Sequence, residues 1–506
     1  MKKKIRVRFA PSPTGALHIG GLRTALYNYL YAKKYNGDFI LRIEDTDSKR
    51  NIKNSIDYIL KTFKWCNIKY NEGYKKKNSK YGPYIQSKRI NIYKKYLKYL
   101  INKNFAYYSF ETKKQLNIYK KENKNFIYNS LNRKKLKNSL TLNKYLIKKY
   151  IKKKKYVIRI KTPKNTNIIF YDKVYGRIKI NTNEIDDKII FRSDLTPTYH
   201  LASVIDDYLM KITHIIRGKE WIYSTPIHII IYKYFKWKLP NFVHLPLILN
   251  NSGGKISKRF NNNNNIPIYP IKYNKNDFTI INSYEEKGFL PDALINIIAL
   301  LGWSPNPNNN KDIYTLKEMI KLFNFNNISK SDVHLNYKKF CYINKIYIKN
   351  TNNSLIDKIL LKYLKTKIIN NNIKNIYIKK IIKLTKNRIF LINDIWDVSY
   401  YFFINPTKFN IPNNINIFIK KKYKKIILFF KRIKYFFKKK RNKKNIEILL
   451  NNISNTNILL LKLLRISLVG KLIGINMLYI LYLINNKIII NRINYFIKFI
   501  ISQYKI

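Results

Sequence analysis

Residues 11–21 constrain the fold of this chain more than any other stretch, and they read Pro-Ser-Pro-Thr-Gly-Ala-Leu-His-Ile-Gly-Gly. They hold three glycines and two prolines, although all 506 residues contain only 14 glycines and 15 prolines. A short apolar run at 5–10 precedes them, and residues 18–34 follow with helical periodicity. A strand, a Gly/Pro turn and a helix in this order present free backbone N–H groups and a positive helix end to phosphates. The stretch therefore predicts a nucleotide site with His18 in the first helical turn; the plainer alternative is an ordinary strand–helix turn.

The alternation of strand and helix patterns continues after this turn. Residues 38–43 are apolar and strand-like, which completes a βαβ pattern. From about 89 to 194 the chain becomes rich in Lys and Tyr, and we interpret this part as an insertion with a small fold of its own. A βα pattern resumes over residues 198–217, and helical periodicity dominates beyond about 345.

Three of the 27 acidic residues, Glu44, Asp45 and Asp47, fall within four positions after the predicted 38–43 strand. In an open α/β sheet the carboxyl ends of the strands line the ligand crevice. A carboxylate there can bind an ammonium group or a ribose hydroxyl. Alternatively, Asp45 or Asp47 caps a helix predicted over residues 52–63, which leaves Glu44 unexplained.

Residues 253–259 read Gly-Gly-Lys-Ile-Ser-Lys-Arg. The two glycines suit a loop that can bring Lys255 and Lys258 onto a triphosphate, and lysines are point charges suited to a departing pyrophosphate. Lysine is so common in this chain that the pattern alone is weak. The pattern supports a triphosphate site only because the same chain also contains residues 11–21.

Tyr199 and Arg217 flank a predicted strand–helix–strand, so they could converge on one pocket. Asp206 and Asp207 lie between them in the sequence. Either these two carboxylates belong to the same pocket, or they only form ion pairs with basic side chains nearby.

The charge of the chain is extreme, because 101 Lys and Arg against 27 Asp and Glu give a net charge of +74. Such a field attracts polyanions, and nucleic acid is the first candidate. However, Lys, Asn and Ile dominate everywhere and all have AT-rich codons, so genome bias accounts for much of this charge. Support for a nucleic-acid partner must therefore come from the sequence motifs and not from the net charge.

The sequence also favours a reducing compartment and no membrane partner. Cys66 and Cys341 are far apart and lack the spacing of a disulfide framework or a zinc site. Arg6 and Arg8 interrupt the apolar residues near the N-terminus, which does not fit a signal peptide. The apolar run at 472–486 is short for a membrane span and predicts a core helix.

Six motifs follow one another along the chain: R-F-A-P-S-P-T-G-x-L-H-I-G, R-I-E-D-T-D, P-T-Y, D-D, R-G-x-E and K-I-S-K-R. In this order they resemble the signatures of the class I aminoacyl-tRNA synthetases, and within that class the bacterial-type glutamyl-tRNA synthetases. The resemblance continues through residues 288–294 and 300–303, and more faintly to Arg388 and residues 464–470. It therefore spans essentially the whole chain.

The resemblance implies an α/β fold with a Rossmann-type catalytic domain, an inserted acceptor-binding α/β subdomain and an all-α C-terminal anticodon-binding region. The implied boundaries are 1–88 and 195–250 for the catalytic domain, 89–194 for the inserted acceptor-stem-binding subdomain, 251–345 for a signature-loop and stem-contact region, and 346–506 for the anticodon-binding region.

The resemblance also implies the site residues. His18, Lys255 and Lys258 would be catalytic residues on the ATP phosphates, and Gly20 would leave room for adenine; Gly15 and Ser257 would complete the ATP site. The glutamate site would comprise Arg8, Glu44, Tyr199 and Arg217, with Glu44 accepting the α-ammonium group. Arg388 would read the third anticodon base, unless it is one more solvated cation.

Some positions depart from the family pattern. Gly21 ends the H-I-G-H motif, Lys219 stands where an acidic residue is usual, and Ser203 replaces a larger polar residue. Residues 108–110 and 128–130 lack the cysteines with which some relatives bind zinc. We therefore expect no structural zinc and no other resident metal.

The implied activity is that of a cytoplasmic, monomeric glutamate–tRNA ligase that uses ATP, Mg²⁺, L-glutamate and tRNA-Glu. A glutaminyl-tRNA synthetase is an alternative, but its C-terminal half is typically a β-barrel. A glutamyl-queuosine tRNA synthetase would lack the anticodon-binding region. A non-catalytic or altered-specificity RNA-binding relative is the third alternative, against which the intact His18 and Lys255/Lys258 motifs argue.

Overall fold

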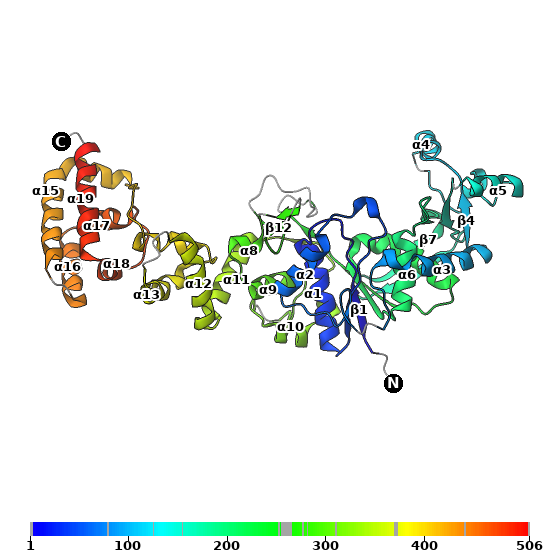
Figure 1. The fold of residues 1–506 in the computed structure, drawn as a ribbon, viewed down its shortest axis with the longest axis horizontal. Coiled ribbons are helices and arrows are strands. Elements are labelled where there is room, and N and C mark those ends of the chain that lie inside the picture. Colours follow the sequence, from blue (N-terminus) through cyan, green and yellow to red (C-terminus); the bar gives the residue numbers. More distant parts are fainter. Residues whose placement is uncertain are drawn as a thin grey trace. The chain divides into compact units, whose positions relative to one another are not determined.

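The computed structural model describes residues 4–77, 80–124, 126–153, 155–250, 254, 266–275, 278–280, 282–308, 311–368, 373–439 and 442–503. The chain divides into two compact units (Figure 1). The first unit comprises Met1–Glu286 and Pro291–Ile343, and the second comprises Lys287–Leu290 and Asn344–Ile506. Lys255, Ser257 and Lys258 lie outside the described residues.

A parallel sheet with a βαβ unit forms the centre of the first unit. Strand β1 (Arg6–Phe9) pairs in parallel with β2 (Asp38–Leu41), which pairs with β3 (Glu72–Gly73). Helix α1 (Ile19–Lys34) connects β1 to β2, and α2 (Ser55–Trp65) precedes β3. All four residues of β1 are buried, as expected for a strand covered on both faces. The βαβ pattern of the sequence is therefore present in the structure.

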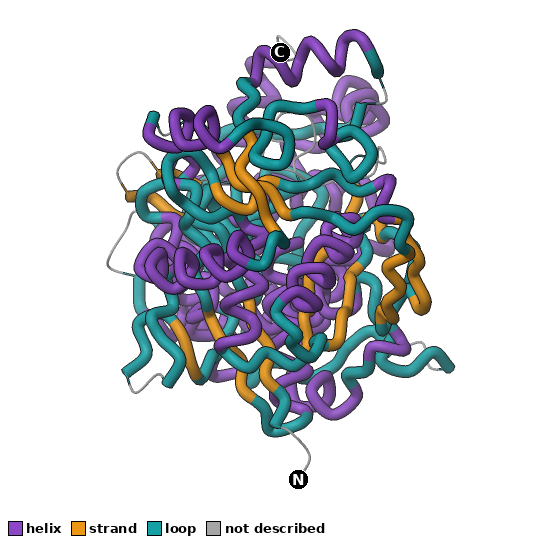
Figure 2. The backbone as a smooth tube through the Cα atoms, turned by 90° about the vertical axis from the view of Figure 1, so that its right-hand side faces the viewer, coloured by secondary structure: helices purple, strands orange, loops and turns teal. Residues whose placement is uncertain are grey.

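A second sheet of four strands lies next to β1, on the side away from β2. The Thr213 N–H, directly before β9 (His214–Gly218), donates to the Arg6 carbonyl at 2.9 Å. Strand β9 pairs in parallel with β10 (Asn241–Leu245), which pairs with β6 (Asn167–Asp172), and β6 forms a hairpin with β7 (Gly176–Asn181). Figure 2 shows the strands of the chain in orange and its helices in purple. The three-stranded sheet β3-β2-β1 and the four-stranded sheet β9-β10-β6-β7 lie side by side at β1 and β9, and the strand order changes direction there, where open α/β sheets place their ligand crevice.

The segment between Tyr199 and Arg217 differs from the expected strand–helix–strand. It contains one helix, α6 (Tyr199–Leu209), and one strand, β9. Helix α7 (Thr225–Tyr234) then connects β9 to β10. The prediction of a strand at the start of this segment was wrong because the helix begins directly after Thr198, and Tyr199 is already its first residue.

Residues 89–194 contribute both a separate small sheet and part of the four-stranded one. After α3 (Ile90–Asn102), the antiparallel strands β4 (Ala106–Ser109), β5 (Val157–Ile160) and β8 (Ile189–Phe191) form a three-stranded sheet. Helices α4 (Lys113–Glu122) and α5 (Lys144–Lys152) lie between β4 and β5 in the sequence. The β6–β7 hairpin from the same segment joins the four-stranded sheet, and one apolar core includes α3, β5, β8, α6 and α7.

Two helices in the rest of the first unit pack against α1. Strands β11 (Ile248–Leu249) and β14 (Val333–His334) pair in parallel, β12 (Tyr273–Lys275) and β13 (Phe278–Ile280) form a hairpin, and α8 (Tyr284–Lys287) follows. Helices α9 (Pro291–Leu300) and α10 (Leu316–Leu322) contact α1. The buried Arg23 of α1 donates to the Leu301 carbonyl at 2.8 Å.

From α11 onward, all elements in the described part of the second unit are helical. They are α11 (Tyr337–Asn350), which spans the boundary after residue 343, α12 (Asn353–Lys367), α13 (Asn375–Thr385), α14 (Asp394–Asp397), α15 (Asn413–Lys438), α16 (Lys443–Thr456), α17 (Ile458–Val469), α18 (Met477–Leu483) and α19 (Asn486–Gln503), with short 3₁₀ turns between. Phe430, Leu464 and Phe496 belong to one buried core of this unit.

The apolar run at 472–486 contains the seven-residue helix α18, which starts after the Asn476 cap, and it ends at the first residue of α19. The prediction of one core helix over this run was therefore wrong in extent, although Met477, Ile480 and Leu481 are buried. Among the described residues, no helix has both the length and the hydropathy that a membrane crossing requires.

Residues 287–290 belong to the second unit, although the residues before and after them belong to the first. The Leu290 N–H donates to Asn344 Oδ1 at 2.8 Å, and the Ile392 N–H donates to the Gly288 carbonyl at 3.0 Å. Gly288 has a φ of +91°, and a Cβ there would lie 2.8 Å from the Ile392 nitrogen, so only glycine fits. The chain thus passes between the units three times, after residues 286, 290 and 343.

Candidate active site

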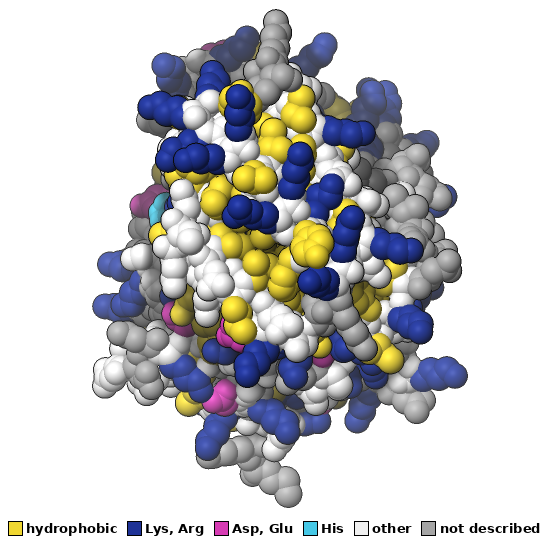
Figure 3. Space-filling view, turned by 90° about the vertical axis from the view of Figure 1, so that its left-hand side faces the viewer, with side chains coloured by type: hydrophobic (Ala, Val, Ile, Leu, Met, Phe, Trp, Pro, Cys, Tyr) yellow, Lys and Arg dark blue, Asp and Glu magenta, His cyan; other side chains and the backbone are white. Residues whose placement is uncertain are grey.

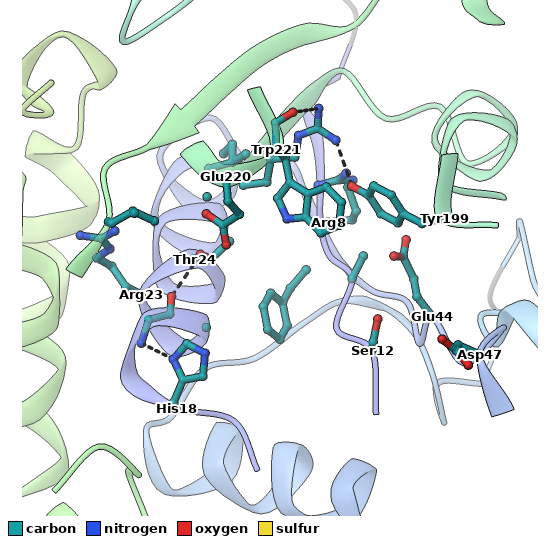
Figure 4. A pocket seen from close by; sticks show the side chains of 18 of the residues that line it. Arg8, Ser12, His18, Arg23, Thr24, Glu44, Asp47, Tyr199, Glu220 and Trp221 are labelled. Carbon is teal, nitrogen blue, oxygen red and sulfur yellow. Dashed lines mark hydrogen bonds between the residues drawn. The ribbon is translucent and has the colours of Figure 1, made fainter. Parts of the chain in front are cut away.

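A cavity of about 390 Å³ lies at the carboxyl ends of β1, β2 and β9. Figure 4 shows His18 on one side of it and Glu44 and Tyr199 on the opposite side. The carboxyl ends of parallel strands meet at one edge of a sheet, which is why residues from three distant strands converge here. Six of the predicted site residues line the cavity: Arg8, His18, Gly20, Glu44, Tyr199 and Arg217.

His18 is the N-cap residue of α1, one position before the first helical turn in which we expected it. Its Nδ1 accepts a hydrogen bond from the Gly20 N–H at 3.1 Å. A neutral imidazole carries one proton, so this bond leaves the proton on Nε2. His18 therefore offers an N–H donor next to the positive end of α1, which suits a phosphate oxygen.

Each of the three glycines in residues 11–21 is explained by a different feature of the structure. A Cβ on Gly20 would lie 2.9 Å from His18 Cε1 and 3.0 Å from His18 Nδ1, so the glycine leaves space for the capping imidazole. A Cβ on Gly21 would meet the Leu17 side chain. Gly15 has a φ of +127°, a conformation that favours glycine, and it is not among the described residues that line the cavity. Space for adenine at Gly20 stays a prediction.

Arg8 and Arg42 share one buried carboxylate, that of Asp207. Arg8 donates to both Asp207 oxygens, at 2.9 and 3.1 Å, and Arg42 donates to Asp207 Oδ1 at 2.8 Å. Burial alone would raise the pKa of the Asp207 carboxyl, but the two guanidinium groups outweigh it and hold this pKa below its usual value. Arg8 is therefore held in place by an ionised partner outside the cavity lining.

Glu44 is also tied to this network, because Arg42 donates to Glu44 Oε1 at 2.8 Å. Burial raises the pKa of the Glu44 carboxyl, and Arg42 offsets only part of that effect. Among the described residues, Glu44 Oε2 has no hydrogen-bond partner, and Glu44 lines the cavity. This oxygen is thus placed to accept a hydrogen bond from a ligand.

Asp206 faces a second set of buried donors. Arg89 Nε lies 2.7 Å from Asp206 Oδ1, while Tyr93 and Gln86 donate to Oδ2 at 2.8 and 2.9 Å. Asp206 and Asp207 therefore pair with basic side chains, which was one of the two alternatives open from the sequence.

The proposed helix-capping role of Asp45 or Asp47 is wrong. Asp45 accepts hydrogen bonds from the Ser87 N–H at 2.8 Å and the Ser87 hydroxyl at 2.6 Å. Helix α2 follows Asn54 instead, whose left-handed backbone conformation begins the helix without a side-chain cap.

Arg217 differs from Arg8 and Arg42 because its hydrogen bonds go to uncharged acceptors. Arg23 and Arg192, which also line the cavity, share this property among the described residues. It donates to the Tyr199 hydroxyl at 2.9 Å, to Thr225 Oγ1 at 2.8 Å and to the Trp221 carbonyl at 3.4 Å. His244 Nε2 and His228 Nδ1 accept its remaining hydrogen bonds. Within the described ranges no carboxylate forms an ion pair with Arg217, so the cavity holds a cation whose charge is left for a ligand.

Two further positions that the sequence analysis singled out, Lys219 and Arg388, do not line the cavity. Lys219 forms an ion pair with Asp332 at 2.6 Å and does not line the cavity. Arg388 belongs to the second unit, where it is exposed and donates to the Gly474 carbonyl at 2.7 Å.

A small apolar cluster lies next to residues 108–110 and 128–130, where the resemblance suggested the zinc ligands of some relatives. Tyr107, Tyr128 and Leu136 pack together there, and the Tyr128 hydroxyl donates to Glu111 Oε2 at 3.2 Å. In the part of the chain that the structure describes, no three His, Cys, Asp or Glu side chains converge as metal ligands would.

Comparison with known proteins identifies the family. Residues 4–341 match the family model described as tRNA synthetases class I (E and Q), catalytic domain. The glutamate–tRNA ligase of Flavobacterium psychrophilum is 41% identical over 505 residues, which cover 97% of this chain and 99% of that protein. The chain belongs to the glutamate–tRNA ligase family. The glutamate–tRNA ligase of Azobacteroides pseudotrichonymphae is 44% identical over 413 residues, 80% of this chain and 81% of that protein.

Solved structures of the family match nearly the whole chain. A glutamate–tRNA ligase from Elizabethkingia meningosepticum, in complex with its amino acid, has a TM-score of 0.88 and 36% identity over 98% of this chain and 99% of that one. The glutamate–tRNA synthetase of Elizabethkingia anophelis has a TM-score of 0.87 and 36% identity over 98% of this chain and 100% of that one. The predicted family and the mixed α/β class I synthetase fold are confirmed.

The sequence motifs did not indicate the residues that contact the cavity-lining side chains from the protein interior. Arg42 stands inside the R-I-E-D-T-D motif, but nothing in the sequence shows that it joins Asp207 to Glu44. His228 and His244 contact Arg217. The chain has only six histidines, so their rarity was a signal that could have drawn attention to them.

Proposed function

We propose that this chain activates L-glutamate with ATP and transfers the glutamyl group to the 3′-terminal adenosine of tRNA-Glu. One observation carries the proposal beyond family membership. His18 at the N-terminus of α1 lies on one side of a single cavity, and Glu44 and Tyr199 lie on the other. Arg217, which donates to the Tyr199 hydroxyl, lines the same cavity and pairs with no carboxylate among the described residues. The first side suits the phosphates of ATP, and the second suits an amino acid with an acidic side chain.

In the first step, the α-carboxylate of glutamate attacks the α-phosphorus of ATP in line. A carboxylate oxygen–phosphorus bond forms, the bond to the β-phosphate breaks, and glutamyl-AMP and pyrophosphate result. His18 Nε2–H and the N-terminus of α1 stabilise charge on the phosphates, as do Lys255 and Lys258 in this proposal. Mg²⁺ neutralises ATP when bound, and we assign it no protein ligands because the described residues offer no such cluster. In the second step, a ribose hydroxyl of the terminal adenosine attacks the glutamyl carbonyl and AMP leaves.

Recognition of glutamate follows from the charges around the cavity. The free oxygen of Glu44 accepts the α-ammonium group, and Tyr199 and Arg217 bind the side-chain carboxylate, while Arg8 adds positive charge nearby. Glutamine would leave the Arg217 charge buried without a counter-charge. Sites built for a polar substrate group reject analogues that lack it by large factors. This argument favours a glutamate enzyme over a glutaminyl-tRNA synthetase.

The remaining parts of the chain serve tRNA in this proposal. Residues 89–194 bind the acceptor stem, residues 251–345 contact the stem, and the helices of residues 346–506 bind the anticodon, with Arg388 as the reader of its third base. On the face drawn in Figure 3, Lys and Arg side chains far outnumber Asp and Glu. A positive surface of this kind binds the phosphate backbone. We place the enzyme in the cytoplasm as a monomer, in keeping with its two free cysteines.

A charging assay tests the proposal. Purified protein is given tRNA-Glu or tRNA-Gln with radiolabelled glutamate or glutamine, together with ATP and Mg²⁺. The expected result is glutamate on tRNA-Glu and no charging with glutamine. Charging of tRNA-Gln with glutamine would overturn the assignment in favour of a glutaminyl-tRNA synthetase. Tight tRNA binding without any charging would favour a non-catalytic relative.

A further inference from the structure

A continuous chain of hydrogen bonds runs from Arg217 into the protein, away from the cavity. Arg217 Nε donates to His244 Nε2 at 3.1 Å, and His244 Nδ1 lies 2.7 Å from Asp172 Oδ2. On the other side, Arg217 Nη1 lies 3.3 Å from His228 Nδ1, and His228 Nε2 lies 3.2 Å from His200 Nδ1. Three of the six histidines of the chain are thus connected through one arginine.

The positions of the protons in this chain follow from the arginine. A guanidinium group only donates, so His244 Nε2 and His228 Nδ1 must both be unprotonated acceptors. The proton of His244 then lies on Nδ1 and is donated to Asp172. The proton of His228 lies on Nε2 and is donated to His200. Each of the two hydrogen bonds from Arg217 to a histidine therefore requires a neutral imidazole in one particular tautomer.

Burial keeps these histidines neutral. The His244 side chain has no exposed surface, and His228 is 1% exposed. Burial lowers the pKa of both imidazoles, and the positive charge of Arg217 lowers it further. Asp172 is held as an acceptor as well, because its Oδ1 also accepts from the Val174 and Tyr175 N–H groups at 2.9 and 3.0 Å.

The five hydrogen bonds of Arg217 fall into two groups by position. Tyr199 and Trp221, which accept two of them, line the cavity, whereas His228, His244 and Thr225 do not. The bond to the Trp221 carbonyl is the longest of the five at 3.4 Å, and the Tyr199 hydroxyl stands at the cavity wall, so a ligand carboxylate can compete for both donors. The two front donors can therefore pass to a ligand carboxylate while the three rear bonds keep the guanidinium in place.

We propose that His244, His228 and Asp172 are positioning residues that orient Arg217 as an uncompensated cation and thereby set the preference for glutamate over glutamine. The inference rests on the proposed function, because it assigns Arg217 to the side-chain carboxylate of glutamate. Neutral acceptors fix the guanidinium without cancelling its charge, whereas a carboxylate in their place would leave little charge for the substrate. Asp172 acts one bond further away, where it selects the tautomer of His244.

The decisive test compares His244→Leu with His244→Gln. Leucine keeps most of the volume but removes the acceptor for Arg217 Nε, whereas the glutamine side-chain oxygen can take the position of Nε2. Pyrophosphate exchange is measured with tRNA present, for glutamate and for glutamine, together with the KM for ATP. A hydrogen bond to a charged group is worth roughly tenfold or more, so we expect His244→Leu to raise the KM for glutamate and to lower the glutamate-to-glutamine ratio of kcat/KM by about that factor.

The remaining variants separate positioning from general damage. His244→Gln should restore most of the ratio, and the KM for ATP should stay unchanged in both variants. His214→Leu is the matched control, because His214 lies on β9, the strand of Arg217, is buried and hydrogen-bonds to Tyr31 at 3.1 Å, but does not line the cavity. It should leave the ratio unchanged.

Should His244→Leu fail to fold, Asp172→Asn replaces it. An asparagine amide can donate to His244 Nδ1 and so favour the wrong tautomer, which should lower the same ratio. A ratio that stays at the wild-type value in a folded His244→Leu or Asp172→Asn variant overturns the inference. If the wild-type enzyme does not prefer glutamate at all, the proposed function itself fails, which is a different result.

Discussion

Replacing Arg42 by methionine should destabilise the first unit more than any surface change, because Arg42 joins two buried carboxylates. Arg42 has no exposed surface and donates to Asp207 and Glu44, each at 2.8 Å. Hydrogen bonds to charged groups contribute about 1.5–3 kcal/mol each, so two of them amount to about 3–6 kcal/mol. Loss of one partner from a buried ion pair costs about 3–5 kcal/mol in other proteins, which agrees. Either figure is a large fraction of a typical total stability of about 5–15 kcal/mol.

The pH dependence of the lost unfolding free energy shows whether the loss comes from the charge of Arg42 or from its packing. Arg8 still pairs with Asp207 in the variant, but Glu44 loses its ion-pair partner, so its pKa in the folded state should rise further. A carboxyl whose folded pKa lies above its unfolded value destabilises the fold at high pH, and the penalty falls as the pH approaches the unfolded value. The difference in unfolding free energy between wild type and Arg42→Met should therefore shrink between pH 7 and pH 5.

Urea unfolding followed by tryptophan fluorescence measures this difference, because four of the five tryptophans lie in the first unit. The control is Arg50→Met, since the Arg50 side chain is 70% exposed and its contact with Asp47 is 3.9 Å long. An exposed pair of this kind is worth about 0–1 kcal/mol. The reasoning is refuted if Arg42→Met loses less than about 1 kcal/mol at pH 7, or if the loss grows towards pH 5.

Three further predictions concern other parts of the chain. His18→Ala should slow single-turnover formation of glutamyl-AMP by roughly 10²–10³ with the fold intact; a rate within about threefold of wild type would remove His18 from the site. Burial and the nearby Lys173 lower the pKa of His214 to about 4, so its neutral form stabilises the fold above pH 6.5 and this stability is lost as the pH falls towards 4. His214→Leu should therefore show a flatter dependence of urea stability on pH in that window, and an unchanged slope would contradict this. Arg388→Gln should lower the preference for tRNA-Glu over tRNA-Gln by about 1–3 kcal/mol in charging assays at matched salt; equal losses with both tRNAs would indicate a phosphate contact.

The sequence was informative where short-range geometry decides the structure. Hydrophobic periodicity around residues 11–21 predicted the βαβ unit, and the end of a strand predicted the place of Glu44. The partners of Arg217 were beyond such reasoning, because Asp172, His228 and His244 lie on β6, α7 and β10 and meet only through strand pairing and helix packing. The apolar run at 472–486 misled us for a related reason, since hydropathy does not show where Asn476 begins a new helix.

Residues 287–290 determine where this chain can be truncated and how its C-terminal helices can be exchanged with those of a relative. A chain cut after residue 343 would keep Phe289 and Leu290, which are 3% and 7% exposed, but would lose Asn344 and Ile392, to which this segment is hydrogen-bonded. Such a fragment would expose apolar side chains and leave a backbone N–H without its acceptor. The C-terminal helices therefore cannot be exchanged between relatives as a simple appendage at one junction; an exchange that keeps both parts folded has to carry residues 287–290 along with them.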